Sequence, residues 1–234
     1  MTLKDLQTYS YVPYSETPGI SVVRSQGDGF FPGVRIENAS FPLTINSLQS
    51  ALFNCISEGE KPKAAYINPE QSCNIEFWKS EYGLWIYDLE ELDESKFTPI
   101  LMQIKSDQTP KKLHELLGQA QPIYSDFPVS ALLETEQGFI SGVNIECSEW
   151  SYGLCAERVA LSKALAYGIE TFKAIHIHTR DGEFSSPCGA CRQVLVEHMK
   201  DQQVHLYHAD GTNSQHFTSD LLPYSFHSSK LKKK

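Results

Sequence analysis

Three cysteines in the second half of the sequence have the spacing of a metal site. Cys188 and Cys191 form a Cys-x-x-Cys pair directly after Pro187, a residue that fits the first turn of a helix. The pair alone is ambiguous, because thioredoxin-like redox sites have the same spacing. Cys155 supplies a third thiol at the start of another expected helix. Helix N-termini favour thiolates, so the two helices would hold one Zn²⁺ and leave its fourth position open, as in a catalytic site.

Two charged residues follow Cys155 within one turn of the expected helix. Arg158 lies three positions after Cys155, so the two side chains share a helical face. Three thiolates around one Zn²⁺ leave a net negative charge, and the Arg158 guanidinium is placed to offset that charge. Glu157 lies between them in the first turn, where a lone carboxylate often only complements the helix dipole. The role of Glu157 therefore has to come from the wider motif.

The chain contains an internal repeat. The matched segments are Tyr14-Ser15 with Tyr124-Ser125, Gly33–Glu37 (GVRIE) with Gly142–Glu146 (GVNIE), and Ala51-Leu52 with Ala160-Leu161. The offset is 110 residues for the first pair of segments and 109 residues for the other two. A stretch that reads as a helix follows in both halves and ends near a glycine, which is common punctuation for a helix C-terminus. Matches in register at several places predict two copies of one unit.

The order of expected elements is also shared by the two copies. In the second copy, residues 129–146 read as strand, turn and strand, residues 172–179 and 203–209 as strands, and a helix runs from Pro187 to about Met199. In the first copy, residues 20–37 and 63–68 read in the same way. The pattern predicts an α/β fold with two tandem α/β/α domains, each a mixed, mostly parallel sheet flanked by helices. The polar run at 105–112 places their boundary between 1–105 and 106–234.

Composition narrows the class of protein. Hydrophobic residues make up 41% of the 234 residues, enough for a packed core. The net charge is −9, and four basic residues, Lys230 and Lys232–Lys234, lie in the last five positions. So acidic a chain is a poor match for nucleic acid or anionic membranes, and we expect neither as a partner. With no signal sequence or apolar spanning segment visible, we expect a cytoplasmic protein whose cysteines are thiols or metal ligands.

The motifs resemble those of the zinc-dependent cytidine deaminases. The segments that carry the resemblance are YSDFPVSALL (124–133), GVNIE (142–146), GLCAERVAL (153–161), SPCGACRQVL (186–195) and LLPYSF (221–226). A cysteine rather than a histidine before Ala-Glu narrows the resemblance to the branch that acts on free nucleosides. It covers nearly all of residues 110–228. It implies hydrolytic deamination of cytidine or deoxycytidine to uridine or deoxyuridine with release of ammonia, as in pyrimidine salvage, with one Zn²⁺ per chain.

The resemblance also implies roles for single residues. Exchange of an aromatic amine for oxygen needs hydroxide at neutral pH, which Zn²⁺ supplies by lowering the pKa of bound water. Glu157 would not bind the metal; it would take the water proton, deliver it to the ring nitrogen, and later protonate the leaving ammonia. Asn144 and Glu146 would bind the ribose hydroxyls. Phe127 would pack against the nucleoside, and the backbone at Ala156 would contact the edge of the base.

Some residues depart from the family pattern. Cys147 replaces the usual asparagine after Glu146, Ser130 replaces a glycine, and the loop at 148–152 is unlike the usual form. These departures keep open the same chemistry on a modified nucleoside or a nucleoside antibiotic. A polynucleotide cytosine deaminase is a further alternative, although the acidic charge argues against it. A zinc module without catalytic activity would have no use for the proton shuttle that Glu157 provides.

The first half lacks the residues of this chemistry. Asn46 stands at the position of Cys155, and Leu48 stands at the position of Glu157. At most one cysteine of the Cys-x-x-Cys pair, Cys73, remains in this half. One thiol without a carboxylate cannot assemble a catalytic zinc site. We therefore expect a degenerate domain that binds no zinc.

One loop of the first half keeps the ordinary form of the family. The loop is NASFP at 38–42, and in the family this loop reaches across a subunit interface into a neighbour's pocket. We expect the inactive half to lend Ala39 and Phe41 to a zinc-containing pocket, of the same chain or of a partner chain. The resemblance further implies a homodimer that mimics a four-domain assembly.

Overall fold

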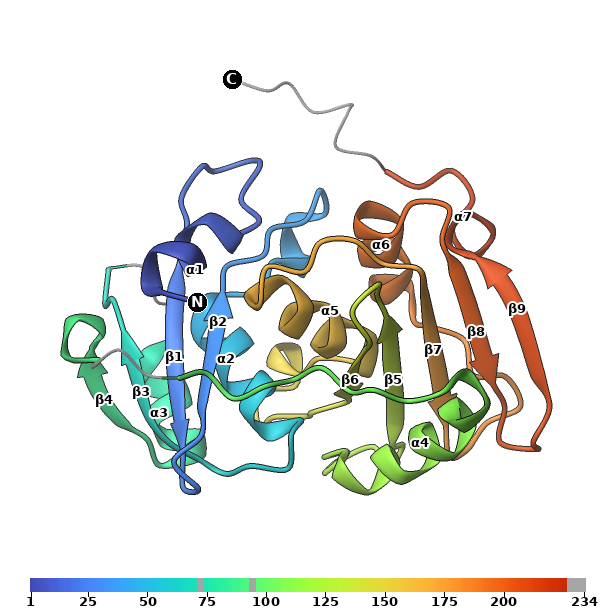
Figure 1. The fold of residues 1–234 in the computed structure, drawn as a ribbon, viewed down its shortest axis with the longest axis horizontal. Coiled ribbons are helices and arrows are strands. Elements are labelled where there is room, and N and C mark those ends of the chain that lie inside the picture. The colour runs from blue at the N-terminus through green and yellow to red at the C-terminus, as the bar shows by residue number, and fades with distance from the viewer. Residues whose placement is uncertain (71–73, 93–95, 227–234) are drawn as a thin grey trace. The chain divides into compact units, whose positions relative to one another are not determined.

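The computed structural model describes residues 1–70, 74–92 and 96–226, and it separates into two compact units (Figure 1). Unit 1 comprises residues 1–37, 44–99 and 162–169, and unit 2 comprises residues 38–43, 100–161 and those from 170 onward. The main division therefore falls between Pro99 and Ile100. Two short segments are exchanged between the units. Residues 38–43 of the first half belong to unit 2, and residues 162–169 of the second half, which include the last part of helix α5, belong to unit 1.

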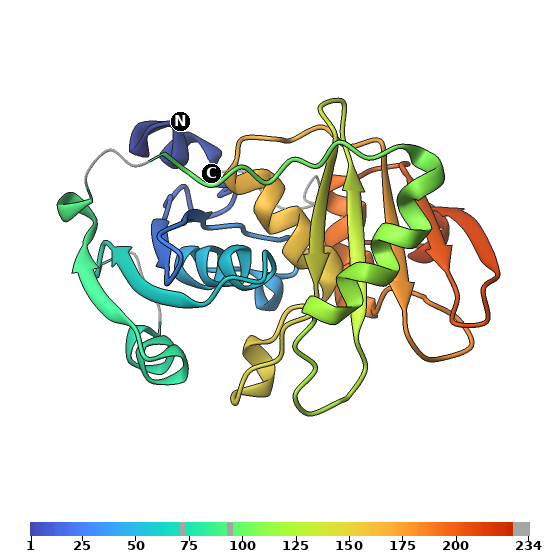
Figure 2. The ribbon, with the colours of Figure 1, turned by 60° about the horizontal axis from the view of Figure 1, so that its bottom comes forward.

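Unit 2 contains the segments with the candidate metal ligands. Its strands are β5 (Val129–Glu134), β6 (Phe139–Val143), β7 (Ala174–Thr179), β8 (Gln203–Tyr207) and β9 (Asn213–Phe217), in the order β6-β5-β7-β8-β9. Its helices are α4 (Thr109–Leu116), the first part of α5 (Ala156–Ala166), α6 (Gly189–His198) and α7 (Thr218–Leu221). Helix α4 contacts β5 and β7, and in Figure 2 it lies in front of the sheet while α6 lies behind it. The sheet is thus covered on both faces.

Unit 1 repeats the core of this arrangement in a smaller form. Its strands are β1 (Ile20–Ser25), β2 (Phe30–Val34), β3 (Pro62–Ile67) and β4 (Trp85–Asp88), in the order β2-β1-β3-β4. Its helices are α1 (Leu3–Tyr9), α2 (Ser47–Ile56) and α3 (Ile75–Tyr82). Helix α2 is buried along its whole length, as the helix under the sheet of a two-layer core must be. Short 3₁₀ turns lie at Phe41–Leu43, Leu89–Glu91, Ser106–Gln108, Leu117–Gln119 and Trp150–Tyr152 across the two units.

The structure confirms the α/β class and corrects the prediction of mostly parallel sheets. Among the described residues, β3–β4 and β7–β8 are the parallel pairs, and the remaining neighbours pair antiparallel. A tight turn joins β5 to β6, and tight turns permit antiparallel pairing alone. After the crossover through α5, β7 runs in the same direction as β6 but lies beside β5. Because β5 and β6 are antiparallel, β5 and β7 are antiparallel too. Strand direction therefore follows from strand order, which the alternation of elements does not encode.

The repeat is visible in how each hairpin packs on its helix. A Cβ atom at Gly33 would lie 2.2 Å from the backbone nitrogen of Ala51, on α2. A Cβ atom at Gly142 would lie 2.2 Å from the backbone oxygen of Ala156 and 2.5 Å from the nitrogen of Ala160, on α5. Only glycine allows a strand to approach a helix so closely. Both copies therefore use the same contact, and in unit 2 it holds the start of α5.

No helix in the described part of the chain combines the length and the apolar character that crossing a bilayer requires.

Replacing Gly142 with alanine should destabilise unit 2, because the new methyl group meets helix backbone that cannot move aside. We expect the free energy of unfolding to fall by about 3 kcal/mol, together with a loss of metal binding. Gly118→Ala is the matched control, since its Cβ has no atom within 4 Å and its backbone needs no positive φ. Urea denaturation measures the free energy of unfolding of both variants. A Gly142→Ala protein as stable as the control would contradict this packing.

Candidate metal centre

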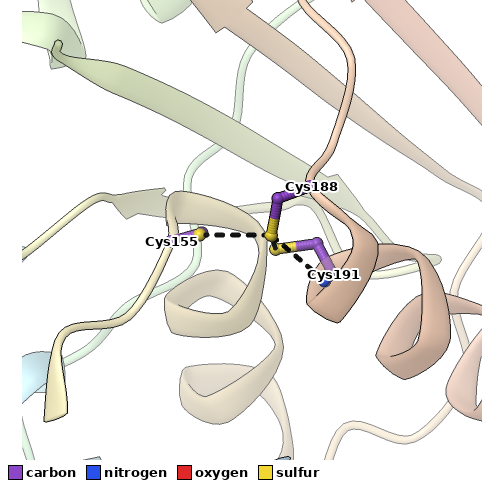
Figure 3. A group of neighbouring side chains, drawn as sticks. All are labelled: Cys155, Cys188 and Cys191. Atoms are coloured by element: carbon purple, nitrogen blue, oxygen red, sulfur yellow. Dashed lines mark hydrogen bonds between the residues drawn. The ribbon is translucent and has the colours of Figure 1, made fainter. Parts of the chain in front are cut away.

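The three cysteines expected to bind metal lie together at the starts of two helices (Figure 3). Cys155 directly precedes α5, Cys188 is the N-cap residue of α6, and Cys191 lies in the first turn of α6. The Sγ atom of Cys188 is 3.7 Å from that of Cys155 and 3.5 Å from that of Cys191. All three Sγ atoms lie within 4.8 Å of one another, and no other such group of histidine, cysteine and acidic residues is found in the described residues.

These sulfur positions fit a tetrahedral zinc ion. Sulfur ligands at about 2.3 Å from a tetrahedral centre are about 3.8 Å apart, close to the observed separations. They are also far beyond the length of a disulfide, and the cysteines are free thiols. The backbone N–H of Cys191 points at the Sγ atom of Cys188, 3.5 Å away, as expected at a helix N-terminus. Three sulfur ligands leave one position of a tetrahedral ion for another molecule.

The electrostatics of the cluster favour one thiolate before any metal binds. Hydrogen bonds with the thiols of Cys155 and Cys191 lower the pKa of Cys188 to about 2. The same contacts raise the pKa of Cys155 and Cys191 above the usual range for a thiol. Zinc binds cysteine as thiolate, so a metal held by all three residues must displace the protons of the other two.

Glu157 lies beside this cluster, and one of its two carboxyl oxygens has no hydrogen-bond partner among the described residues. It is the second residue of α5, its exposed fraction is 3%, and it interacts with the side chain of Cys191. That oxygen, Oε2, is itself buried. Burial raises the pKa of Glu157 to about 7. A carboxyl group that is held between its two protonation states near neutral pH suits proton transfer.

A cavity of about 190 Å³ opens next to the cysteine cluster. It is lined by Asn144, Ile145, Glu146, Trp150, Gly153, Leu154 and Cys155. The structure therefore brings two of the expected sugar-binding residues and one expected metal ligand to the same cavity. A small concave site with a few polar groups is the usual form of a ligand pocket.

The amide of Asn144 is oriented by the chain that leads into β5. Its Oδ1 atom accepts a hydrogen bond from the N–H of Val129 at 2.7 Å. Its Nδ2 atom donates to the carbonyl oxygen of Phe127 at 2.9 Å, which uses one of its two amide hydrogens. Asn144 is thus fixed in position and keeps a donor for a ligand.

The carboxylate of Glu146 is oriented in a similar way. It accepts hydrogen bonds from the backbone N–H groups of Tyr124 and Ser125 and from the Ser125 hydroxyl. Partial burial opposes ionisation, but these hydrogen bonds prevail and lower the pKa of Glu146. In unit 1, Glu37 accepts the equivalent bonds from Tyr14 and Ser15. Glu146 is therefore a fixed anion at the cavity.

Other predicted residues lie outside the cavity lining. Ala156 is fully buried as the first residue of α5, and Phe127 is partly exposed. The Nη2 atom of Arg158 donates to the carbonyl oxygen of Leu43 at 2.9 Å, whereas its buried Nε atom has no described partner. No hydrogen bond from Arg158 to a cysteine sulfur is present among the described residues. That Arg158 offsets the net negative charge of the three-thiolate site thus stays a prediction.

The loop at residues 38–43 belongs to unit 2. The N–H of Ala39 donates to the Glu197 carboxylate, on α6, at 2.8 Å. Phe41 has an exposed fraction of 83%, and neither Ala39 nor Phe41 lines the cavity of the same chain.

The residue of unit 1 that corresponds to Cys155 is Asn46, and it caps a helix. The side chain of Asn46 accepts a hydrogen bond from the N–H of Gln49 and caps α2. Leu48 is fully buried, and so is Cys55, as expected for a small apolar side chain. Cys73 and the lysine-rich tail at 230–234 lie outside the described residues.

Histidines 176 and 178 play no part in the cluster. His176 stacks on His205 with ring centroids 4.5 Å apart, and His178 bonds to the backbone of Tyr207. Trp150 also lines the cavity, although the sequence did not single it out as a site residue. The unusual form of the 148–152 loop was the signal that could have indicated it.

Comparison with known proteins identifies the family. Residues 104–207 match the family model described as "Cytidine and deoxycytidylate deaminase zinc-binding region". The chain is 42% identical to a cytidine deaminase of Sporosarcina psychrophila over 110 residues, which are 46% of this chain and 81% of that protein. It is 40% identical to a probable cytidine deaminase of Dictyostelium discoideum over 105 residues, covering 44% and 71% of the two chains.

A solved structure agrees with these sequence relatives. The crystal structure of cytidine deaminase from Burkholderia pseudomallei superposes with a TM-score of 0.50 and 34% identity, covering 53% of this chain and 100% of that chain. The three clustered cysteines, the buried Glu157 and these relatives all support one assignment. The chain belongs to the zinc-dependent cytidine deaminase family.

Proposed function

We propose that the second half of the chain, residues 106–234, catalyses the hydrolytic deamination of cytidine or deoxycytidine to uridine or deoxyuridine, with release of ammonia. The observation that carries this proposal is the buried, unpartnered carboxyl oxygen of Glu157 beside three sulfur atoms spaced for zinc. The relatives named above are described as cytidine deaminases, so a modified nucleoside or a polynucleotide is not needed as an alternative substrate.

Cys155, Cys188 and Cys191 would hold one Zn²⁺ per chain. When bound, Zn²⁺ acts as a Lewis acid that makes water a nucleophile at neutral pH. Glu157 accepts a proton from the attacking water, because its raised pKa lets it gain and lose a proton near neutral pH. It then delivers that proton to the ring nitrogen and assists the departure of ammonia. Arg158 lies on the same helix and offsets the negative charge of the three thiolates.

The substrate would bind through residues of the cavity and its surroundings. Glu146, held as a fixed anion, accepts hydrogen bonds from ribose hydroxyls, and Asn144 donates its second amide hydrogen to them. The backbone at Ala156 contacts the edge of the base. Phe127, whose side chain is partly exposed near this region, packs against the nucleoside.

The first half would have a structural role in a homodimer. Residues 1–105 form the degenerate domain, which lacks the zinc ligands. Phe41 is exposed and does not line the cavity of its own chain, which favours donation of Ala39 and Phe41 to the pocket of a partner chain. Free cysteines favour a cytoplasmic protein, and deamination of free nucleosides would serve pyrimidine salvage.

Replacing Glu157 with glutamine should lower kcat for cytidine by about a thousandfold, because the amide cannot transfer a proton. Loss of cytidine absorbance measures turnover, and zinc per chain is measured on the same samples. We expect zinc content to stay at one ion per chain, since Glu157 binds no metal. Glu170→Gln, which alters an exposed acidic residue of unit 2, is the control and should leave kcat unchanged. Full turnover in the Glu157→Gln protein would refute the proposed mechanism.

Replacing Phe41 with alanine should raise KM for cytidine roughly tenfold, because an aromatic contact with the substrate in the partner's pocket is lost. Zinc content should stay the same. Phe217→Ala, at another exposed phenylalanine of unit 2, should leave KM unchanged. Sedimentation velocity reports whether both proteins remain dimers. A monomeric wild-type protein, or a normal KM for the Phe41→Ala dimer, would defeat the donated-loop proposal.

A further inference from the structure

We infer that His208 is a positioning residue for the metal centre. Its imidazole holds the segment that leads into α6, and thereby orients the two cysteines at the start of that helix. His208 directly follows strand β8, and the segment comprises residues 180–187, between β7 and Cys188. The inference rests on the proposed function, because it requires that Cys188 and Cys191 bind zinc.

The segment is tied to the sheet at Ser185, three positions before Cys188. Ser185 is fully buried, and its N–H donates to the Nδ1 atom of His208 at 3.1 Å. Its hydroxyl donates to the carbonyl oxygen of Tyr207 at 2.7 Å and lies 2.8 Å from the hydroxyl of Thr179. Because a buried N–H without an acceptor is costly, the imidazole of His208 fixes the backbone of the segment at this point.

The contacts of His208 determine which ring nitrogen carries the proton. A nitrogen that accepts from an N–H group carries no hydrogen, so the neutral ring is protonated at Nε2. This Nε2 atom lies 3.1 Å from the hydroxyl oxygen of Ser214, on β9, and donates to it. The same hydroxyl lies 3.0 Å from the Nε2 atom of His216, which accepts its hydrogen. His208 is therefore an acceptor toward the segment and a donor toward the sheet.

His208 is itself held by the turn between β8 and β9 and by an aromatic neighbour. Its N–H donates to the carbonyl oxygen of Thr212 at 2.9 Å, and its carbonyl oxygen accepts from the N–H of Gly211 at 3.0 Å. The ring of Phe184 stacks on the imidazole, with centroids 4.6 Å apart and planes at 27°. The exposed fraction of His208 is 6%. The acceptor offered to Ser185 thus has a fixed position.

A second residue binds the segment from the side of the helix. Arg192 lies on α6 and donates to the carbonyl oxygen of Pro187 at 2.8 Å and to the hydroxyl of Ser186 at 2.6 Å. These bonds join the end of the segment to α6, so the two move as one body. The bonds of Ser185 then tie that body, with its two cysteines, to the ends of β7 and β8.

The test uses the full-length protein and two measurements that need no turnover. Zinc affinity is measured in competition with a chelator, and hydrogen–deuterium exchange is measured for the peptide that spans 180–187. In His208→Ala we expect zinc affinity to fall about tenfold, as when other groups that orient metal ligands are removed, and exchange in this peptide to increase. His114→Ala, at an exposed histidine of α4, is the control and should match the wild type.

Two amide variants separate the hydrogen bond from the bulk of the ring. In His208→Asn, the Oδ1 atom takes the position of Nδ1 and keeps an acceptor for the N–H of Ser185. We therefore expect zinc affinity and exchange close to those of the wild type. In His208→Gln the amide is one carbon further from the backbone and takes the position of Nε2. This variant should behave like His208→Ala.

The outcomes separate this inference from the proposed function. Wild-type zinc affinity in His208→Ala overturns the inference, and so does a His208→Asn protein that behaves like His208→Ala. Faster exchange throughout unit 2 also overturns it, because His208 would then support the whole fold. If the wild-type protein binds zinc without converting cytidine, the proposed function fails, while the zinc affinities of the variants still decide the inference. A wild-type protein that binds no zinc overturns both.

Discussion

The contact between strand β6 and the start of helix α5 determines where the chemistry of this protein can occur. At Gly142 the strand approaches the helix so closely that a single methyl group would overlap the backbone of Ala156. Cys155 and Glu157 are the neighbours of Ala156 on either side, so the contact fixes a sulfur ligand and a buried carboxyl group at once. The remaining two sulfur atoms come from the start of α6, which follows the central strand β7.

The same scaffold in unit 1 shows what the repeat requires and what it leaves free. The close contact at Gly33 is retained, and the helix start is retained with Asn46 as its cap. A residue at a helix start can thus cap the helix or bind a metal without a change in the fold. At the position of Glu157, Leu48 packs as a buried apolar side chain. Replacing a buried carboxyl group with leucine removes the cost of desolvating a charge, so loss of catalysis is compatible with a stable core.

Much of the site could be predicted from the sequence because its ligands are placed by local rules. Helix starts are marked by the residues around Cys155 and Cys188, and three thiols with these spacings have few other uses. The repeat could be predicted because the glycines at 33 and 142 serve one packing contact. Strand direction could not, since the position of β7 beside β5 depends on the path of the whole chain. The contacts of Ala39 with Glu197 and of Trp150 with Tyr124 also escaped prediction, because they join residues whose proximity no periodic pattern encodes.

The proposed chemistry requires that three cysteine sulfurs form a metal site with one open position. X-ray absorption spectroscopy at the zinc edge tests it most directly, on the full-length protein with its metal content determined. We expect one zinc per chain, with three sulfur neighbours at about 2.3 Å and one lighter oxygen or nitrogen neighbour. Four sulfur neighbours would mean a closed structural site, and an absence of sulfur neighbours would mean that the metal binds elsewhere. Either result would rule out a catalytic zinc held by Cys155, Cys188 and Cys191.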